Sequence, residues 1–169
     1  MSEALAHTAT GPGTPSLRRR LACFVYEGVL LFGVLATAGY LFAGFAQQRH
    51  ALANRTLLQA FLFFVLAIYF VWFWTHGGQT VAMKTWGIRL LTRDGKTVSQ
   101  PRAFVRYMLC WLWFLPALAA AWLIGIRSAL ALFLGAIVGV VVYAAVSRLL
   151  PDRQFLHDAV CGTRLVSTP

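Results

Sequence analysis

The sequence has few charged residues and very few acidic ones. Charged side chains make up 12% of its 169 residues, and only 5 are Asp or Glu against 15 Lys or Arg. Soluble domains carry about 25% charged residues. Hydrophobic residues reach 59%, and the mean hydropathy is +0.68. A soluble fold of this length could not bury so much apolar surface, so the composition predicts an integral membrane protein.

Metal-binding and catalytic motifs are also missing. The three cysteines, Cys23, Cys110 and Cys161, are far apart and form no Cys-x-x-Cys or Cys-His zinc pattern. No two histidines have the i, i+4 spacing of metal ligands on a helix, and no P-loop, nucleophile elbow or Rossmann fingerprint occurs. The sequence therefore predicts no metal site, no cofactor and no enzymatic activity.

Long apolar runs are what the sequence does contain. Four occur, at residues 22–46, 57–74, 107–126 and 129–146. Each has about the length that crosses a hydrocarbon core of ~30 Å as a helix. Pro116 predicts a kink in the third run. Arginines before the first run also suit a secretory signal, but the run continues past the Ala36-Thr37-Ala38 segment, so we predict an uncleaved helix.

Lysines and arginines are divided unequally between the two sides of these four predicted spans. The N-terminus, the 75–106 loop and the 147–169 tail share one side and carry 12 of them, against 3 on the other side. The positive-inside rule then predicts that both termini are cytoplasmic. Contact with anionic lipid headgroups accounts for the net charge of +10 without nucleic acid. Residues 1–16, small and polar, predict a disordered cytoplasmic tail.

The cytoplasmic segments contain signals for secondary structure of their own. In the 75–106 loop we predict a short helix over 79–86 ended by Gly87, a strand over 88–93, and a type I′ turn at Asp94-Gly95 with a return over 96–99. A Gly-x-Arg-Leu pattern at Gly87 recurs at Gly162, which indicates a similar strand over 163–167. The fold class is therefore an all-α membrane protein with four transmembrane helices and a small cytoplasmic cap of a β-hairpin and short helices. Whether the two similar strands pair stays open.

A few charged residues lie inside or beside the apolar runs. A carboxylate within a span costs about 2.5–3.5 kcal/mol on insertion scales, so Glu27 is expected to face the bundle interior and to have a partner. The residues expected to converge at the cytoplasmic boundary are Arg20, Glu27, Arg102, Arg106 and Asp158, with Gln79, Lys84 and His157 as weaker candidates. Two interpretations stay open: an ion-pair network that locks the tail onto the helices, and a site for a proton, an ion or an anionic group.

Small residues in the fourth span form a Gly-x-x-x-Gly pattern at Gly135 and Gly139, and Gly39 with Ala43 forms a weaker pair in the first span. Small residues allow helices to approach closely. They predict helix packing, either within one chain or between copies in a homo-oligomer.

Four short motifs occur in order along the chain: Arg20 to Glu27; Gly77-Gly78-Gln79-Thr80 with Lys84, Gly87 and Asp94-Gly95; Arg102 with Arg106; and Leu156-His157-Asp158 before Gly162-Thr163. Together they resemble the RDD family of small bacterial membrane proteins, which is named for an arginine and an aspartate at the first helix and a later aspartate. Glu27 stands in place of the first aspartate, and Asp158 matches the second. The resemblance spans about residues 18–166 and implies a multi-pass domain in the bacterial inner membrane, placed here at 17–166. Ion or solute transport has been proposed for some members.

Two functions are compatible with these observations. The first is a non-catalytic membrane subunit that assembles with another membrane protein or with copies of itself. The second is a small proton- or cation-coupled transporter that uses the carboxylate of Glu27 within the membrane. Four spans are few for a monomeric transporter, and no two spans are visibly interrupted at corresponding positions, which favours the first function.

Overall fold

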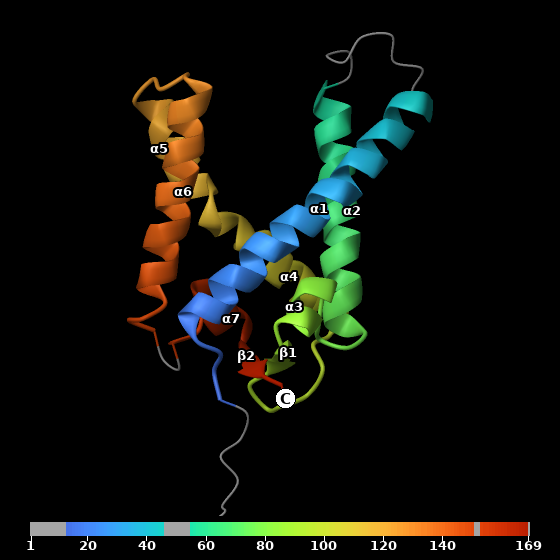
Figure 1. Cartoon of the computed structure of the whole chain (residues 1–169), viewed down its shortest axis with the longest axis vertical. Helices are drawn as coiled ribbons and strands as arrows, with labels where there is room; N and C mark the ends of the chain where they lie inside the picture. The colour runs from blue at the N-terminus through green and yellow to red at the C-terminus, as the bar shows by residue number, and fades with distance from the viewer. Residues whose placement is uncertain (1–12, 46–54, 151–152, 169) are drawn as a thin grey trace, which may run out of the picture.

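A computed structural model describes residues 13–45, 55–150 and 153–168 of the chain (Figure 1). In this part, three helices are long and apolar enough to cross a membrane: α1 (Leu17–Phe45), α2 (Arg55–Thr75) and α6 (Ala129–Val146). Between α2 and α6, the helices α4 (Gln100–Cys110) and α5 (Leu115–Leu123) flank a 3₁₀ turn, η1 (Trp111–Trp113). The described residues thus hold three candidate spans, or four if the α4–α5 pair crosses as one broken span.

The third predicted span is two helices rather than one. Its helical structure begins earlier than predicted, at Gln100, and its two parts meet at 43°. The predicted kink at Pro116 occurs as a break over η1 and Phe114, just ahead of the proline. Proline has no N–H to donate to the carbonyl of Leu112, and its ring would clash with that carbonyl, so the helix breaks before it and restarts with proline in its first turn.

The cap lies at one end of the helices and is built from segments far apart in sequence. Short helices α3 (Val81–Thr85) and α7 (Leu156–Cys161) each precede a strand, β1 (Ile88–Thr92) and β2 (Thr163–Ser167). The two strands pair antiparallel, with Leu90 opposite Leu165 and both side chains buried (Figure 1). The short-helix cap is therefore observed, and the two similar strands do pair.

The predicted β-hairpin after β1 is wrong. A type I′ turn needs positive φ at both central residues, and here only Gly95 has it, at 78°. Residues 96–99 form no strand; instead the N–H of Thr92 donates to the carbonyl of Lys96 at 2.9 Å and closes a loop. The edge of β1 is paired with β2, which the chain reaches only after α4, α5 and α6.

Residues 1–12 of the predicted disordered tail lie outside the described residues. The remainder of that tail, residues 13–16, contacts the cap: the N–H of Ser167 donates to the carbonyl of Gly13 at 2.9 Å, and the amide of Gln154 donates to Thr14 Oγ1 at 3.0 Å. The chain is thus tied to the cap before α1 begins.

The order of elements repeats within the chain. Each half has long helices, then a short helix, a left-handed glycine and a strand; the glycines are Gly87 (φ 56°) and Gly162 (φ 62°). In the two-stranded sheet Ile88 pairs with Ser167, and Thr92 pairs with Thr163. The sheet therefore has an approximate two-fold axis at the Leu90–Leu165 pair, and a 180° rotation about this axis places one Gly-x-Arg-Leu pattern on the other. The fold therefore consists of two similar halves that share one two-stranded sheet.

The two halves pack differently in the membrane region. Helix α2 lies along α4, whereas α6 packs mainly on α5 and η1 and makes no comparable contact with α1 in the part of the chain described. Figure 1 shows the α5–α6 pair diverging from the α1–α2 pair with distance from the cap. One side of α1 is consequently left without a neighbouring helix.

The two glycines of the Gly-x-x-x-Gly pattern in α6 occupy different environments. A Cβ added at Gly139 would lie 2.8 Å from the Cβ of Ala117 in α5, whereas one at Gly135 would meet nothing within 4 Å. Gly139 therefore packs within the chain, as one of the two predicted alternatives requires, and Gly135 does not.

This difference predicts opposite effects of one substitution. Gly139→Ala is expected to lower the free energy of unfolding by about 1–3 kcal/mol through overpacking. Gly135→Ala should raise it by up to about 1 kcal/mol, because alanine favours the helix. Thermal unfolding of both variants in the same detergent measures the difference. Equal transition temperatures would mean that α5 and α6 do not approach at Gly139.

Candidate functional site

A buried ion pair joins the second half of the membrane region to the cap. Arg106 Nε of α4 donates to Asp158 Oδ1 of α7 at 2.7 Å, and the two side chains are 6% and 0% exposed. Thr163 Oγ1, at the start of β2, donates to the same oxygen at 3.0 Å. Because the pair is removed from water, its hydrogen bonds are strengthened and its geometry is fixed.

His157 extends this pair toward α6. Arginine can only donate, so the nitrogen His157 Nε2, 3.2 Å from Arg106 Nη2, is the acceptor and the neutral ring carries its proton on Nδ1. His157 Nδ1 lies 2.8 Å from the hydroxyl of Tyr143, which also accepts the backbone N–H of His157 at 3.0 Å. Helices α4, α6 and α7 are thereby linked through one imidazole ring.

The electrostatics of the cap residues fix their charge states. Burial lowers the pKa of His157 to about 4, and the nearby Arg106 and Arg20 act in the same direction against the attraction of Asp158. Burial alone would raise the pKa of Asp158, but Arg106 and His157, with the hydrogen bonds from Arg106 and Thr163, hold it below its usual value. At neutral pH the site therefore contains a charged Asp158 and an uncharged His157.

Glu27 has a different set of partners from those predicted. Its carboxylate accepts hydrogen bonds from the hydroxyl of Tyr69 in α2, at 2.7 Å, and from the hydroxyl of Thr80. Thr80 is also the N-cap of α3, where its Oγ1 accepts the N–H of Met83 at 3.2 Å. Glu27 forms no ion pair with a lysine or arginine in the described structure, so it fixes α3 to α1 and α2 through hydroxyl groups.

Arg20 is buried, and no described residue forms an ion pair with it. The residue is 5% exposed, and its guanidinium lies 4.4 Å from the centre of the Phe155 ring. Its Nε and Nη1 atoms are buried and have no hydrogen-bond partner in the described part of the chain. The cation–π contact offsets only part of the cost of burying this charge.

The other predicted site residues lie apart from these groups. Arg102 and Lys84 are exposed, and Gln79 is part of the cap, where its amide donates to the carbonyl of Ile88 at 2.8 Å. The structure thus brings Arg106, Asp158 and His157 into contact and leaves Arg102 outside.

Several residues at the site were not identified from the sequence. They include Tyr69 and Tyr143, whose hydroxyls make the hydrogen bonds described above, and Trp74, whose ring lies 4.2 Å from the Arg106 guanidinium. All three belong to apolar runs in which aromatic residues are common, so nothing in the sequence distinguishes them. Thr80 carried a usable signal, because a threonine just before a short helix is a typical N-cap.

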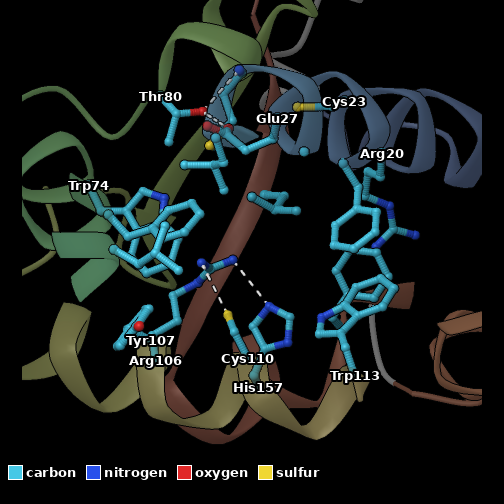
Figure 2. A pocket seen from close by; sticks show the side chains of 18 of the residues that line it. Arg20, Cys23, Glu27, Trp74, Thr80, Arg106, Tyr107, Cys110, Trp113 and His157 are labelled. Carbon is cyan, nitrogen blue, oxygen red and sulfur yellow. Dashed lines mark hydrogen bonds between the residues drawn. The ribbon is translucent and has the colours of Figure 1, made fainter. Parts of the chain in front are cut away.

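A cavity of about 370 Å³ lies beside α1, and six of the residues described above line it: Arg20, Glu27, Trp74, Thr80, Arg106 and His157. Figure 2 shows Arg20 and Trp74 on opposite sides of it, with Glu27 and His157 at two further sides. Its other walls are mostly apolar and aromatic: Phe24, Leu31, Leu66, Phe70, Trp111 and Phe114. No group of three metal-ligating side chains occurs in the described ranges. The cavity volume lies in the roughly 300–1,000 Å³ range of small-molecule sites.

Comparison with known proteins gives one match. The model of the RDD family matches residues 14–162, which include all the long helices and the buried pair of Arg106 and Asp158. No curated protein and no solved structure matches the chain.

Proposed function

This chain belongs to the RDD family, and from that premise we propose that it is a non-catalytic membrane subunit that binds a transmembrane helix of a second protein along α1. One observation carries the proposal. Helix α1 contains Gly28, Gly33, Gly39 and Gly44, and a Cβ added at any of them would meet nothing within 4 Å.

Open glycines in a membrane helix need a reason. Glycine costs about 1 kcal/mol relative to alanine in a helix interior, and small residues at membrane interfaces allow two helices to approach closely. In the described part of the chain, no other helix packs closely against these glycines. Gly28 lines the cavity, and Gly39 lies about three turns further along nearly the same face. A partner helix seated at Gly39, beyond the cavity, would fill the position that α6 leaves open.

The buried polar groups support a structural role for the cap. Asp158 and Arg106 join α7 to α4, and Glu27 joins α1 to α3 through Thr80. In each half, a short helix is thus fixed to the first helix of that half. The cap keeps the membrane helices at set positions, which is what a subunit needs in order to present α1 to a partner.

A pair of matched variants tests the proposal. Gly39→Leu is expected to remove a partner that otherwise copurifies with the tagged chain from native membranes in a fixed ratio. Gly33→Leu should retain it, because Gly33 lies roughly 140° around the helix from Gly28, although it is equally open. The readout is the molar ratio of the two proteins after affinity purification.

Three outcomes would contradict the proposal: no protein in a fixed ratio, a partner retained by both variants, and a partner that is a second copy of this chain. Mass spectrometry of the purified complex identifies the partner and so recognises the last outcome. In that case the protein would be a homo-oligomer and not a subunit of a complex with a second protein.

A second function is favoured by one feature of the cavity. The carboxylate of Glu27 lies within a span and lines the cavity, as a proton- or cation-coupled transporter would require. The purified chain in liposomes containing an ion-sensitive dye provides the test. Under the subunit proposal we expect no flux. Flux that Glu27→Gln abolishes would establish transport and overturn that proposal.

A further inference from the structure

Arg20 separates the apolar cavity from a second hollow with a very different lining. This hollow, of about 890 Å³, lies where α1 begins and α6 ends, and three arginines line it: Arg20, Arg148 and Arg153. No carboxylate is among its described lining residues, and none of the three arginines forms an ion pair with a described residue. We call this hollow the arginine pocket.

The charge at the arginine pocket is incompletely satisfied. Arg148 and Arg153 are exposed to solvent, but Arg20 is 5% exposed, and no described residue accepts a hydrogen bond from its Nε or Nη1. A buried donor without an acceptor costs free energy, more so when it is charged. An anionic oxygen placed between these arginines would satisfy the buried guanidinium and gain charge-assisted hydrogen bonds.

The adjoining cavity indicates what the anion is attached to. From Arg20 the cavity follows α1 past Phe24 and Gly28 to Leu31, away from the arginine pocket and along the membrane-crossing part of the helix. The carboxylate that lines it, Glu27, is held by Tyr69 and Thr80. Beyond Arg20 the site is therefore suited to a hydrocarbon chain, which a free phosphate does not have.

We propose that an anionic phospholipid binds at this site, with its phosphate among Arg20, Arg148 and Arg153 and one acyl chain in the cavity along α1. The order of the two hollows matches a lipid of the leaflet that the charge distribution predicts to be cytoplasmic. The headgroup lies at the beginning of α1, and the chain extends into the bilayer. The lipid chain and the proposed partner helix use different lengths of α1: the cavity lining ends at Leu31, and the partner helix is placed further along, at Gly39.

Lipid titration of the purified full chain, followed by native mass spectrometry, tests the charged part of the site. Phosphatidylglycerol is expected to bind in preference to phosphatidylcholine. Arg20→Gln should weaken phosphatidylglycerol binding by roughly tenfold or more, through loss of a charge-assisted contact. Arg18→Gln is the matched control: it removes the same charge from an exposed position two residues away and should change the affinity by less than about twofold.

A second variant tests the apolar part without altering any charge. A Cβ at Gly28 meets nothing within 4 Å, so Gly28→Phe places a ring in the cavity and should also weaken binding by roughly tenfold. Gly39→Phe, equally open but outside the cavity lining, should bind lipid like the wild type even though it loses the partner helix. The two proposals thus fail separately.

Three results would overturn the lipid site. The first is equal affinity for phosphatidylcholine, which would leave only apolar adsorption. The second is inorganic phosphate displacing the lipid at equal concentration, which would make the arginine pocket a site for a free anion. The third is unchanged lipid binding by both Arg20→Gln and Gly28→Phe.

Discussion

Asp158→Ala is expected to lower the free energy of unfolding by about 3–5 kcal/mol, the usual cost of removing one partner of a buried ion pair. Without the carboxylate, the guanidinium of Arg106 stays buried at 6% side-chain exposure with its charge uncompensated. Thr163 Oγ1 also loses its side-chain acceptor. Equilibrium unfolding in mixed detergent micelles, followed by tryptophan fluorescence, measures the change.

Two further variants make this result interpretable. Asp94→Ala removes a carboxylate from an exposed position of the same cap and should change stability by no more than about 0.5 kcal/mol. Replacing both Arg106 and Asp158 with leucine should restore part of the loss, because no buried charge is then left alone. A loss below about 1 kcal/mol for Asp158→Ala would show that the pair is accessible to water.

Acidification from about pH 6.5 to about pH 4 is expected to reduce stability through His157, by on the order of 3 kcal/mol. Burial keeps the ring neutral in the folded chain, with a pKa of about 4, while the unfolded chain takes up a proton near pH 6.5. The unfolded state therefore binds more protons across this range, and stability falls as the pH falls. Asp158 adds a loss only at lower pH, because its pKa lies below its usual value when folded.

The slope of unfolding free energy against pH is the quantity to measure. His157→Gln should flatten it between pH 4 and 6.5, since glutamine does not titrate. If the His157→Gln variant has the same slope as the wild type, other titratable groups cause the loss of stability.

The sequence predicted the helices well because hydropathy acts locally. The spans at α1, α2 and α6 follow from apolar runs of sufficient length, and the break near Pro116 follows from its missing N–H. The contact between Arg106 and Asp158 was anticipated only as a convergence at one depth. Arg102 lies four residues before Arg106 on the same helix, and nothing local distinguishes the buried arginine from the exposed one.

Predictions that needed long-range information did less well. Asp94-Gly95 is a local signal for a hairpin, but strand pairing is decided by whichever edge packs best, and β2 supplied a buried Leu165 opposite Leu90. The partners of Glu27 were expected to be arginines, since opposite charges are the obvious choice. Tyr69 and Thr80 satisfy it instead, and hydroxyl-bearing residues are too common in sequence for such a pairing to be predicted.

The shared sheet also has a consequence for biosynthesis. Strand β1 is made early, but its partner β2 follows only after α4, α5 and α6. Proteins are synthesised from the N-terminus, so β1 emerges with an unpaired edge and stays so while the second half enters the bilayer. The cap can therefore close only in chains whose last helices have been inserted. In an incomplete chain the edge of β1 stays unpaired, and quality-control proteases could recognise this exposed strand.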